Sequence, residues 1–377
     1  MQRVFLWLST LFALYVSGFA CATDNPLPPG DERPVPHIAL LLPLKSEMFG
    51  SAADAVQRGF MAAANLVLTD PNSLPVRVYS SFDEGSDIVA LYRLAVTNGA
   101  RGVVGPLTRS GVAMLAAESE IPVPTLALNL ADRPAAAQLY FFGMAAEAEA
   151  RQIAQIAKQN GHQQAIVIVT RSQLSHRLQL AFEEEWYGTG GSLVREMLFD
   201  ADPSVLAEIT SLQDTAVFLA ADAMEARKIR PFLPKSQPIY ATSQVFLGNS
   251  DTLGGYDLDG VRFVDMPWLL QTDHPAVMVY PRANPPLSVA HERLYGLGID
   301  AFRLMELMLG NKLSTHLPLD GVSGRLRLDG HIFQRAALPA RFEQGHAEYR
   351  AASAPSTVRM FPDQVLPPAP PGATAQR

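Results

Sequence analysis

Apolar and polar positions along the chain follow two alternating periods. A continuous apolar run at residues 38–44 has the length of a buried strand, and residues 51–68 then place Ala55, Phe60 and Val67 on one helical stripe. Runs of strand length and segments of helical period continue to alternate through most of the chain. Because this alternation is typical of parallel sheets covered by helices on both faces, it predicts the α/β class.

The alternation begins a second time near residue 139, which predicts two doubly wound parallel-sheet lobes. Further strands are predicted at residues 76–82, 102–107, 123–129, 139–144, 165–170, 193–199, 216–221 and 239–243. Helices are predicted at about residues 86–98, 110–119, 147–160, 173–187, 204–212, 222–232 and 294–309. A hairpin at residues 321–330, ending in Asp329-Gly330, and a short strand near residue 341 follow.

The amino-terminal segment has the pattern of a secretory signal. Arg3 precedes an apolar run to about Ala20, and small residues follow it. A retained membrane anchor is the alternative, but the run is short for a membrane span and Pro-rich polar sequence comes next. We therefore predict a signal peptide at residues 1–20, a tether at 21–35 and a disordered Pro-rich tail at 351–377.

Cys21 is the only cysteine in the chain, so no internal disulfide is expected. Its place directly after the apolar run predicts the lipidated first residue of a mature lipoprotein, although Gly18 stands where leucine is usual. Ordinary cleavage after Ala22 is the alternative, because Ala20-Cys21-Ala22 is also an acceptable cleavage site. Lipidation would hold the protein in the periplasm, at the inner face of the outer membrane.

Composition and motifs narrow the function classes. The chain has 377 residues, 48% of them apolar, and a formal charge of −7 without a basic run, which argues against nucleic acid as a partner. Its histidines lack metal-ligand spacing, and one cysteine leaves no thiolate metal site. Sequence motifs of serine hydrolases, penicillin-binding enzymes and phosphate-binding loops are missing. We therefore expect no catalysis, no metal and no cofactor.

Residues 239–270 are the most distinctive stretch of the sequence. A strand-like run ends in Thr242-Ser243, and Leu258–Leu270 then reads Leu-Asp-Gly-Val-Arg-Phe-Val-Asp-Met-Pro-Trp-Leu-Leu. This run, together with Ile38–Leu44 and Gly102–Leu107, resembles the periplasmic-binding-like domain of the LpoA-type penicillin-binding protein activators. The element order over about residues 36–350 is similar to that of type I periplasmic binding proteins.

This resemblance implies a layout in which the chain crosses between the lobes three times. It places lobe 1 at residues 36–138, lobe 2 at 139–267, a return to lobe 1 at 268–320 and a return to lobe 2 at 321–350. The best-known family members carry a large helical-repeat domain ahead of this one, whereas here the tether leads directly into the first predicted strand. Functions that belong to the helical-repeat domain of those members are therefore not expected of this chain.

Polar side chains follow the carboxyl ends of the predicted strands, where ligands of open parallel sheets bind. Candidates for a ring around a small zwitterion or anion are Lys45, Ser46, Thr108, Arg109, Ser110, Asn129, Arg171, Ser172, Asp222, Thr242 and Ser243. The alternative is structural, because Ser110 is a natural helix N-cap and Lys45 and Arg109 are expected to be solvated. The family resemblance implies protein partners. A small-molecule ligand in the cleft is therefore possible but is not expected.

Met266, Pro267 and Trp268 fall at an expected crossover between the lobes. Pro267 fixes the backbone there, and Trp268 is predicted to pack at this hinge, so that its replacement by alanine destabilises the domain. The alternative is an exposed Trp268 that anchors a partner.

The resemblance implies a non-catalytic envelope lipoprotein that docks on a class A penicillin-binding protein, a peptidoglycan synthase, and activates it allosterically. The alternative is a periplasmic solute-binding protein for a small zwitterionic or anionic ligand such as an amino acid. The fold alone supports that alternative.

Overall fold

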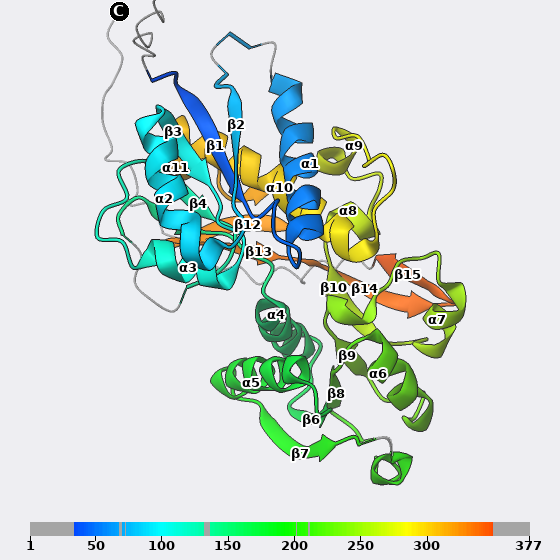
Figure 1. Cartoon of the computed structure of the whole chain (residues 1–377). Helices are drawn as coiled ribbons and strands as arrows, with labels where there is room; N and C mark the ends of the chain where they lie inside the picture. The colour runs from blue at the N-terminus through cyan, green and yellow to red at the C-terminus, as the bar shows by residue number, and fades with distance from the viewer. Residues whose placement is uncertain are drawn as a thin grey trace, which may run out of the picture.

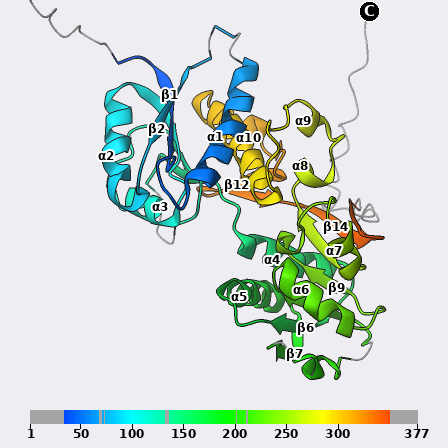
Figure 2. The ribbon, with the colours of Figure 1, turned by 45° about the vertical axis from the view of Figure 1, so that its right-hand side comes forward.

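The computed structural model describes residues 34–349, except 68–69, 72, 132–135, 201 and 210–211. The chain forms two lobes, each built on one β-sheet with helices packed against it (Figure 1). Figure 2 shows lobe 1 above lobe 2. The predicted α/β class with two doubly wound lobes is confirmed. Cys21, the predicted signal peptide, nearly all of the tether and the tail lie outside the described residues.

Lobe 1 combines a parallel sheet with an antiparallel edge. Its strands are β1 (His37–Leu42), β2 (Val76–Ser80), β3 (Ala100–Val104), β4 (Thr125–Ala127), β5 (Leu139–Phe141), β11 (Leu319–Asp320), β12 (Arg325–Asp329) and β13 (Ile332–Ala336). They lie in the order β11-β12-β13-β5-β4-β3-β1-β2. The helices of this part are α1 (Gly50–Val67), α2 (Glu84–Thr97), α3 (Arg109–Ala116), α8 (Pro267–Leu270), α9 (Pro275–Met278), α10 (Val289–Leu309) and α11 (Leu313–His316).

Lobe 2 has a similar plan with a shorter antiparallel edge. Its strands are β6 (Gln164–Val169), β7 (Ser192–Leu198), β8 (Thr215–Ala220), β9 (Ile239–Ala241), β10 (Arg262–Asp265), β14 (Leu338–Glu343) and β15 (His346–Tyr349). They lie in the order β15-β14-β10-β9-β8-β6-β7. Its helices are α4 (Ala146–Gln159), α5 (Gln173–Gly188), α6 (Ala223–Ile229) and α7 (Thr252–Asp257), with 3-10 turns η1 (Pro203–Leu206), η2 (Arg230–Phe232) and η3 (Ser243–Val245).

Two glycines let α1 and α10 cross closely over one face of the lobe 1 sheet (Figure 1). A methyl group on Gly59 would lie 1.9 Å from the carbonyl oxygen of Tyr295. One on Gly298 would lie 2.2 Å from the carbonyl oxygen of Val56. Both distances are far below van der Waals contact, so this crossing requires glycine at both positions. The crossing matters for the lobe junction because α10 also carries residues that reach lobe 2.

The first boundary between the lobes differs from the prediction. Residues 139–144 were expected to open lobe 2, but Leu139–Phe141 is β5 of lobe 1, where it pairs in parallel with β4 and with β13. The first passage to lobe 2 therefore follows β5, at residues 142–145. A short apolar run fits the interior of either sheet equally well, so the hydrophobic pattern does not say which sheet it joins.

The last return also differs from the prediction. The hairpin expected to re-enter lobe 2 is formed by β12 and β13, which extend the lobe 1 sheet through the pairing of Ile332 with Phe141. Its apolar face, with Leu326 and Phe333, is buried in the lobe 1 core. Within the described chain, the three passages thus follow β5, β10 and β13, and the last occurs at Ala337.

Two predicted elements are shorter than expected. The helix expected at residues 204–212 is the single 3-10 turn η1. The strand expected to end at Thr242-Ser243 already ends at Ala241, and η3 follows. The chain turns here because Arg293 of α10 donates hydrogen bonds to the carbonyl oxygens of Ser243 and Phe246, which a continuing strand would direct to a neighbouring strand.

Tyr240 fixes β9 within lobe 2. Its buried hydroxyl oxygen accepts hydrogen bonds from Asn160 at 3.0 Å and from Arg262 at 2.8 Å, and lies 3.1 Å from Nε2 of His162. Because these two donors occupy the acceptor sites of the oxygen, the hydroxyl proton is left to donate to His162, which must then be neutral. Burial, and secondly the charge of Arg262, lower the pKa of His162.

We expect His162 to make the fold less stable in mild acid. Since its pKa in the folded chain lies below the ordinary value of 6.5, the unfolded chain binds more protons between the two values. The stabilising contribution is complete above 6.5 and is lost as the pH falls toward the folded pKa. Urea denaturation at about pH 7.5 and about pH 5 should show a larger loss for the wild type than for His162→Gln. The same loss in both proteins would contradict this assignment.

Candidate functional site at the lobe junction

Five of the eleven candidate cleft residues serve as helix caps or ion-pair partners in the structure. Thr108, Ser172 and Asp222 accept hydrogen bonds from backbone N–H groups at the starts of α3, α5 and α6. Arg171 pairs with Asp200 at 2.5 Å on the surface. These roles stabilise the elements that surround the cleft.

The remaining polar candidates of lobe 1 also have local partners. Lys45 lies 4.9 Å from the ring centre of Phe82, Ser46 accepts from the N–H of Phe49, Ser110 lies 3.1 Å from the hydroxyl of Thr108, and Asn129 donates to the carbonyl of Leu107. These contacts fit the structural alternative, but the N-cap of α3 is Thr108 and not Ser110, which lies within the first turn of the helix. Ligand binding by the ring stays a prediction.

Glu147 connects the two lobes at the edge of the cleft. Arg109 of α3 in lobe 1 and Arg177 of α5 in lobe 2 both reach Oε1 of Glu147, at 3.3 Å and 3.1 Å. Glu147 lies in the first turn of α4, where the helix dipole favours a negative charge. Both arginines are about half exposed, so each pair contributes less than about 1 kcal/mol.

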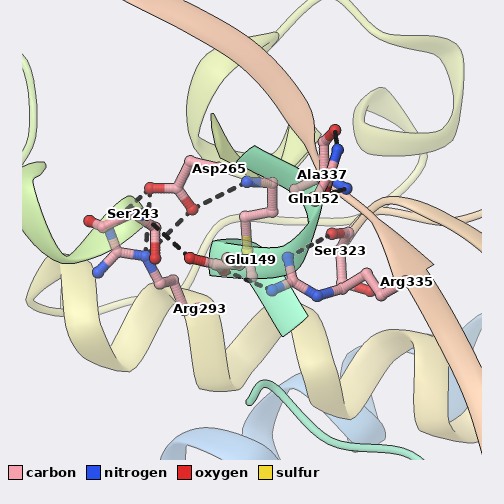
Figure 3. A network of polar contacts seen from close by, with 9 residues as sticks. Glu149, Gln152, Ser243, Asp265, Arg293, Ser323, Arg335 and Ala337 are labelled. Carbon is pink, nitrogen blue, oxygen red and sulfur yellow. Dashed lines mark hydrogen bonds and ion pairs between the residues drawn. The ribbon is translucent and has the colours of Figure 1, made fainter. Parts of the chain in front are cut away.

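A stronger connection lies inside the junction, where two ion pairs are buried side by side (Figure 3). Arg335 donates to Glu149 at 2.6 Å, and Arg293 donates to Asp265 at 2.6 Å. The exposed fractions of these side chains are 6% and 7% for the first pair, and 13% and 1% for the second. Two positive and two negative charges make this buried network locally neutral.

Both ion pairs join one lobe to the other. Glu149 lies on α4 of lobe 2 and Arg335 on β13 of lobe 1, just before the last passage. Asp265 ends β10 of lobe 2 and Arg293 lies on α10 of lobe 1. Ser243 links the pairs, because its N–H donates to Glu149 and its carbonyl accepts from Arg293. This predicted site residue therefore takes part through its backbone.

The last passage between the lobes is also held by a paired hydrogen bond. The side-chain amide of Gln152 donates to the carbonyl of Ala337 at 2.8 Å and accepts from its N–H at 3.0 Å (Figure 3). Burial lowers the pKa of Arg293, but the Asp265 carboxylate raises it, and the net pKa lies above the ordinary value. The guanidinium therefore stays charged. Moving one lobe against the other would separate these buried groups, so the network resists hinge motion.

No sequence pattern predicted a role for Glu149, Arg293 or Arg335. Asp265 belongs to the distinctive run Leu258–Leu270, and a carboxylate directly after the apolar Phe263-Val264 is the one feature that indicates a buried partner. The partner itself was not identifiable, because Asp265 and Arg293 are 28 positions apart and Glu149 and Arg335 are 186 apart.

The predicted hinge residues lie in the lobe 1 core beside this network. Met266 and Trp268 have no exposed surface. The Trp268 ring stacks on Tyr295 at 5.4 Å, Arg282 lies 3.8 Å from its ring centre, and its Nε1 donates to Glu292 at 2.5 Å. Trp268 is therefore a packed residue here, and this burial does not fit the exposed-anchor alternative.

Two features of other protein classes were not found in the described part of the chain. No helix between residues 34 and 349, as described, is long and apolar enough to cross a membrane. Over the same described residues, no group of His, Cys, Asp and Glu side chains is arranged to hold a metal ion.

The amino-acid sequence matches a known protein family over nearly all of the residues that form the two lobes. A family model described as "LppC putative lipoprotein" matches residues 31–215 and 206–345. The chain belongs to the LppC lipoprotein family. Among curated relatives of this LppC chain, "Penicillin-binding protein activator LpoA" of Photobacterium profundum is 25% identical over 340 residues, which is 79% of this chain and 54% of that protein. The chain spans about half the length of the curated relatives it matches.

Solved structures with the same fold come from two kinds of protein. A Chromobacterium violaceum structure, described as "a putative branched-chain amino acid ABC transporter", is 39% identical with a TM-score of 0.69 and covers 81% of the LppC chain and 99% of its own. The LpoA C-domain of Haemophilus influenzae, described as "a regulator of PBP1A", is 23% identical with a TM-score of 0.70 and covers 84% and 100%. The predicted resemblance to LpoA-type proteins is confirmed.

Proposed function

We propose that this LppC protein is a non-catalytic envelope regulator that binds a class A penicillin-binding protein and activates it allosterically. One observation carries the proposal: the fold matches the whole of a solved LpoA C-domain that is described as a regulator of PBP1A. The curated relatives carry the name of penicillin-binding protein activators, which supports the same partner class. In this proposal the lipid on Cys21 places the protein at the inner face of the outer membrane.

The junction supports a regulator better than a solute carrier. Solute-binding proteins of this architecture close around a ligand by hinge motion. Here the buried pairs Glu149–Arg335 and Asp265–Arg293 hold the lobes together, and most polar residues at the cleft already have partners within the chain. A protein whose two lobes are held together in this way presents a fixed surface to its partner. Activation then requires that this surface bind the active form of the synthase more tightly than the resting form.

Reconstitution with a purified class A synthase tests the proposal. The tagged full-length lipoprotein in detergent should bind the synthase and raise its rate of glycan polymerisation or cross-linking. Coupling of this kind is typically about 5- to 150-fold. Affinity capture from solubilised envelopes, followed by mass spectrometry, identifies which synthase to use. If no class A synthase of the envelope binds and no rate changes, the proposal is wrong.

The solute-binding alternative rests on the similarity to the Chromobacterium violaceum structure and makes a different prediction. Under our proposal, branched-chain and other amino acids should leave the melting temperature unchanged. A ligand at 100 times its Kd would stabilise the folded state by about 2.7 kcal/mol. A saturable rise with one amino acid, without any effect on a synthase, would favour the solute-binding alternative.

A further inference from the structure

A groove of about 930 Å³ lies between α4 and the β12–β13 hairpin, and Glu149 and Arg335 of the buried network are part of its lining. Its lining on α4 runs from Ala145 to Gln159, which is about 20 Å at 1.5 Å per residue. The facing wall carries Arg325, Arg327 and Gln334 of the hairpin. A groove as long as a whole helix is suited to an elongated ligand.

Two arginines of this groove have no hydrogen-bond or ion-pair partner among the residues that the structure describes. Arg325 and Arg327 project from one face of β12, because side chains two positions apart in a strand point the same way. Both are exposed. No hydrogen bond or ion pair joins either of them to another residue in the described part of the chain. Their partners across β13, Ala336 and Gln334, are uncharged. On the other side of β12, Arg325 faces Asp320 of β11, which lies 3.4 Å from His274.

The rest of the charged lining is satisfied internally. Arg335 pairs with Glu149, Arg151 pairs with Glu184 at 2.8 Å, and Glu185 accepts from Gln155 at 2.8 Å. Four arginines and two glutamates line the groove, so the lining residues alone carry a charge of 4 − 2 = +2, and the acidic Glu184 and Asp320 lie beside Arg151 and Arg325 just outside the lining. Among the described residues, Arg325 and Arg327 are the arginines of the lining that form no ion pair.

We propose that this groove binds an extended, acidic polypeptide segment of the partner protein, with carboxylates seated on Arg325 and Arg327. That the partner is a class A synthase rests on the proposed function above. The guanidinium fork pairs with carboxylate through two parallel hydrogen bonds. Alternate residues of an extended peptide are about 6.6–6.8 Å apart, which is also the spacing of alternate residues along β12.

Charge and hydrogen bonding favour this occupant. The amides of Gln159 and Gln334 also line the groove and can bond to a peptide backbone. The protein's own segment 351–377 is a poor fit, because Arg359, Asp363 and Arg377 give it a charge of 2 − 1 = +1. On an acidic protein, a local positive groove also directs an acidic segment to one place.

Peptide binding measured by fluorescence anisotropy tests the groove directly. The probe is a labelled peptide of about eight residues in which Glu alternates with Thr, and the reference peptide has Gln in place of Glu. The variant Arg325→Glu/Arg327→Glu should weaken binding by at least about tenfold. The matched control Arg77→Glu/Arg101→Glu changes the net charge equally, at exposed positions of β2 and β3, and should weaken binding by less than about twofold.

Three results would overturn the proposal: equal weakening in both variants, equal binding of the Gln peptide, or no binding of the acidic probe to the wild type. The variant Arg325→Gln/Arg327→Gln guards against an effect on folding, and it should also weaken binding while leaving the melting temperature unchanged. Both positions are exposed, so neither change disturbs the core.

Binding to the purified synthase separates this inference from the proposed function. If the wild type and the control variant bind the synthase and the groove variant binds about tenfold more weakly, both stand. If the groove variant binds the synthase normally, the groove assignment is wrong and the proposed function stands. If the wild type binds the acidic peptide and no class A synthase, the proposed function is wrong and the groove remains an acidic-peptide site.

Discussion

Replacing Glu149 with alanine should lower the free energy of unfolding by about 3–5 kcal/mol, because the change leaves Arg335 buried without its carboxylate. Arg335 is 6% exposed and donates to Glu149 at 2.6 Å. The same substitution removes the acceptor of the Ser243 N–H group. Urea denaturation at neutral pH, followed by circular dichroism, measures the change.

A surface pair provides the matched control for this prediction. Arg93 and Glu118 lie 2.7 Å apart, but their side chains are 70% and 29% exposed. Glu118→Ala should therefore cost less than about 1 kcal/mol. The double variant Glu149→Met/Arg335→Met removes both buried charges and should lose less stability than the sum of the two single variants. Strict additivity would show that the two residues are not coupled, contrary to the network described here.

This network also bears on how a regulator with this fold would act. Its two ion pairs connect α4 to β13 and β10 to α10, so each pair spans the two lobes. Under the proposed function, the conformational change therefore belongs mainly to the synthase, and this protein supplies differential binding energy from a fixed surface. The groove beside α4 lies next to these pairs, since Glu149 and Arg335 contribute to its lining.

Much of the fold was predictable from hydrophobic periodicity. The buried strand β1 and the amphipathic helix α10 appear close to their expected positions, because local period and tertiary environment agree there. The assignment of strands to lobes was less successful. Leu139–Phe141 and the β12–β13 hairpin were placed in the wrong lobe, because the period of a strand reports its burial and not its neighbour in a sheet.

The site was harder to predict than the fold. Ligands of open parallel sheets bind at the carboxyl ends of the strands, and this location predicted polar residues such as Thr108 and Ser172 as ligand-binding. The same positions are helix N-caps, which is the role that both residues have in the structure. Arg335 forms its buried pair with a residue 186 positions away, and neither residue lies in a recognisable motif. Such pairing depends on three-dimensional packing, which the local pattern of a single sequence does not reveal.

Trp268→Ala should destabilise the protein by about 3–5 kcal/mol, as truncation of a fully buried aromatic side chain generally does. The substitution removes the ring that stacks on Tyr295 and lies against Arg282, and it leaves Glu292 without the indole donor. Trp268→Phe is the intermediate control, because it keeps an aromatic ring but loses the hydrogen bond and part of the indole volume, and it should cost less stability than Trp268→Ala. Urea denaturation and synthase binding are measured on the same three proteins.

The two readouts separate packing from partner contact. If Trp268→Ala abolished synthase binding and left stability unchanged, Trp268 would be a partner anchor and the packing assignment would be wrong. The packing assignment leads to one further expectation. Trp268, three residues after Asp265, bonds to Glu292 of α10, and the same helix carries Arg293, the partner of Asp265. Without the indole, that helix is held less firmly against β10, so Asp265→Asn should cost less stability in the Trp268→Ala background than in the wild type.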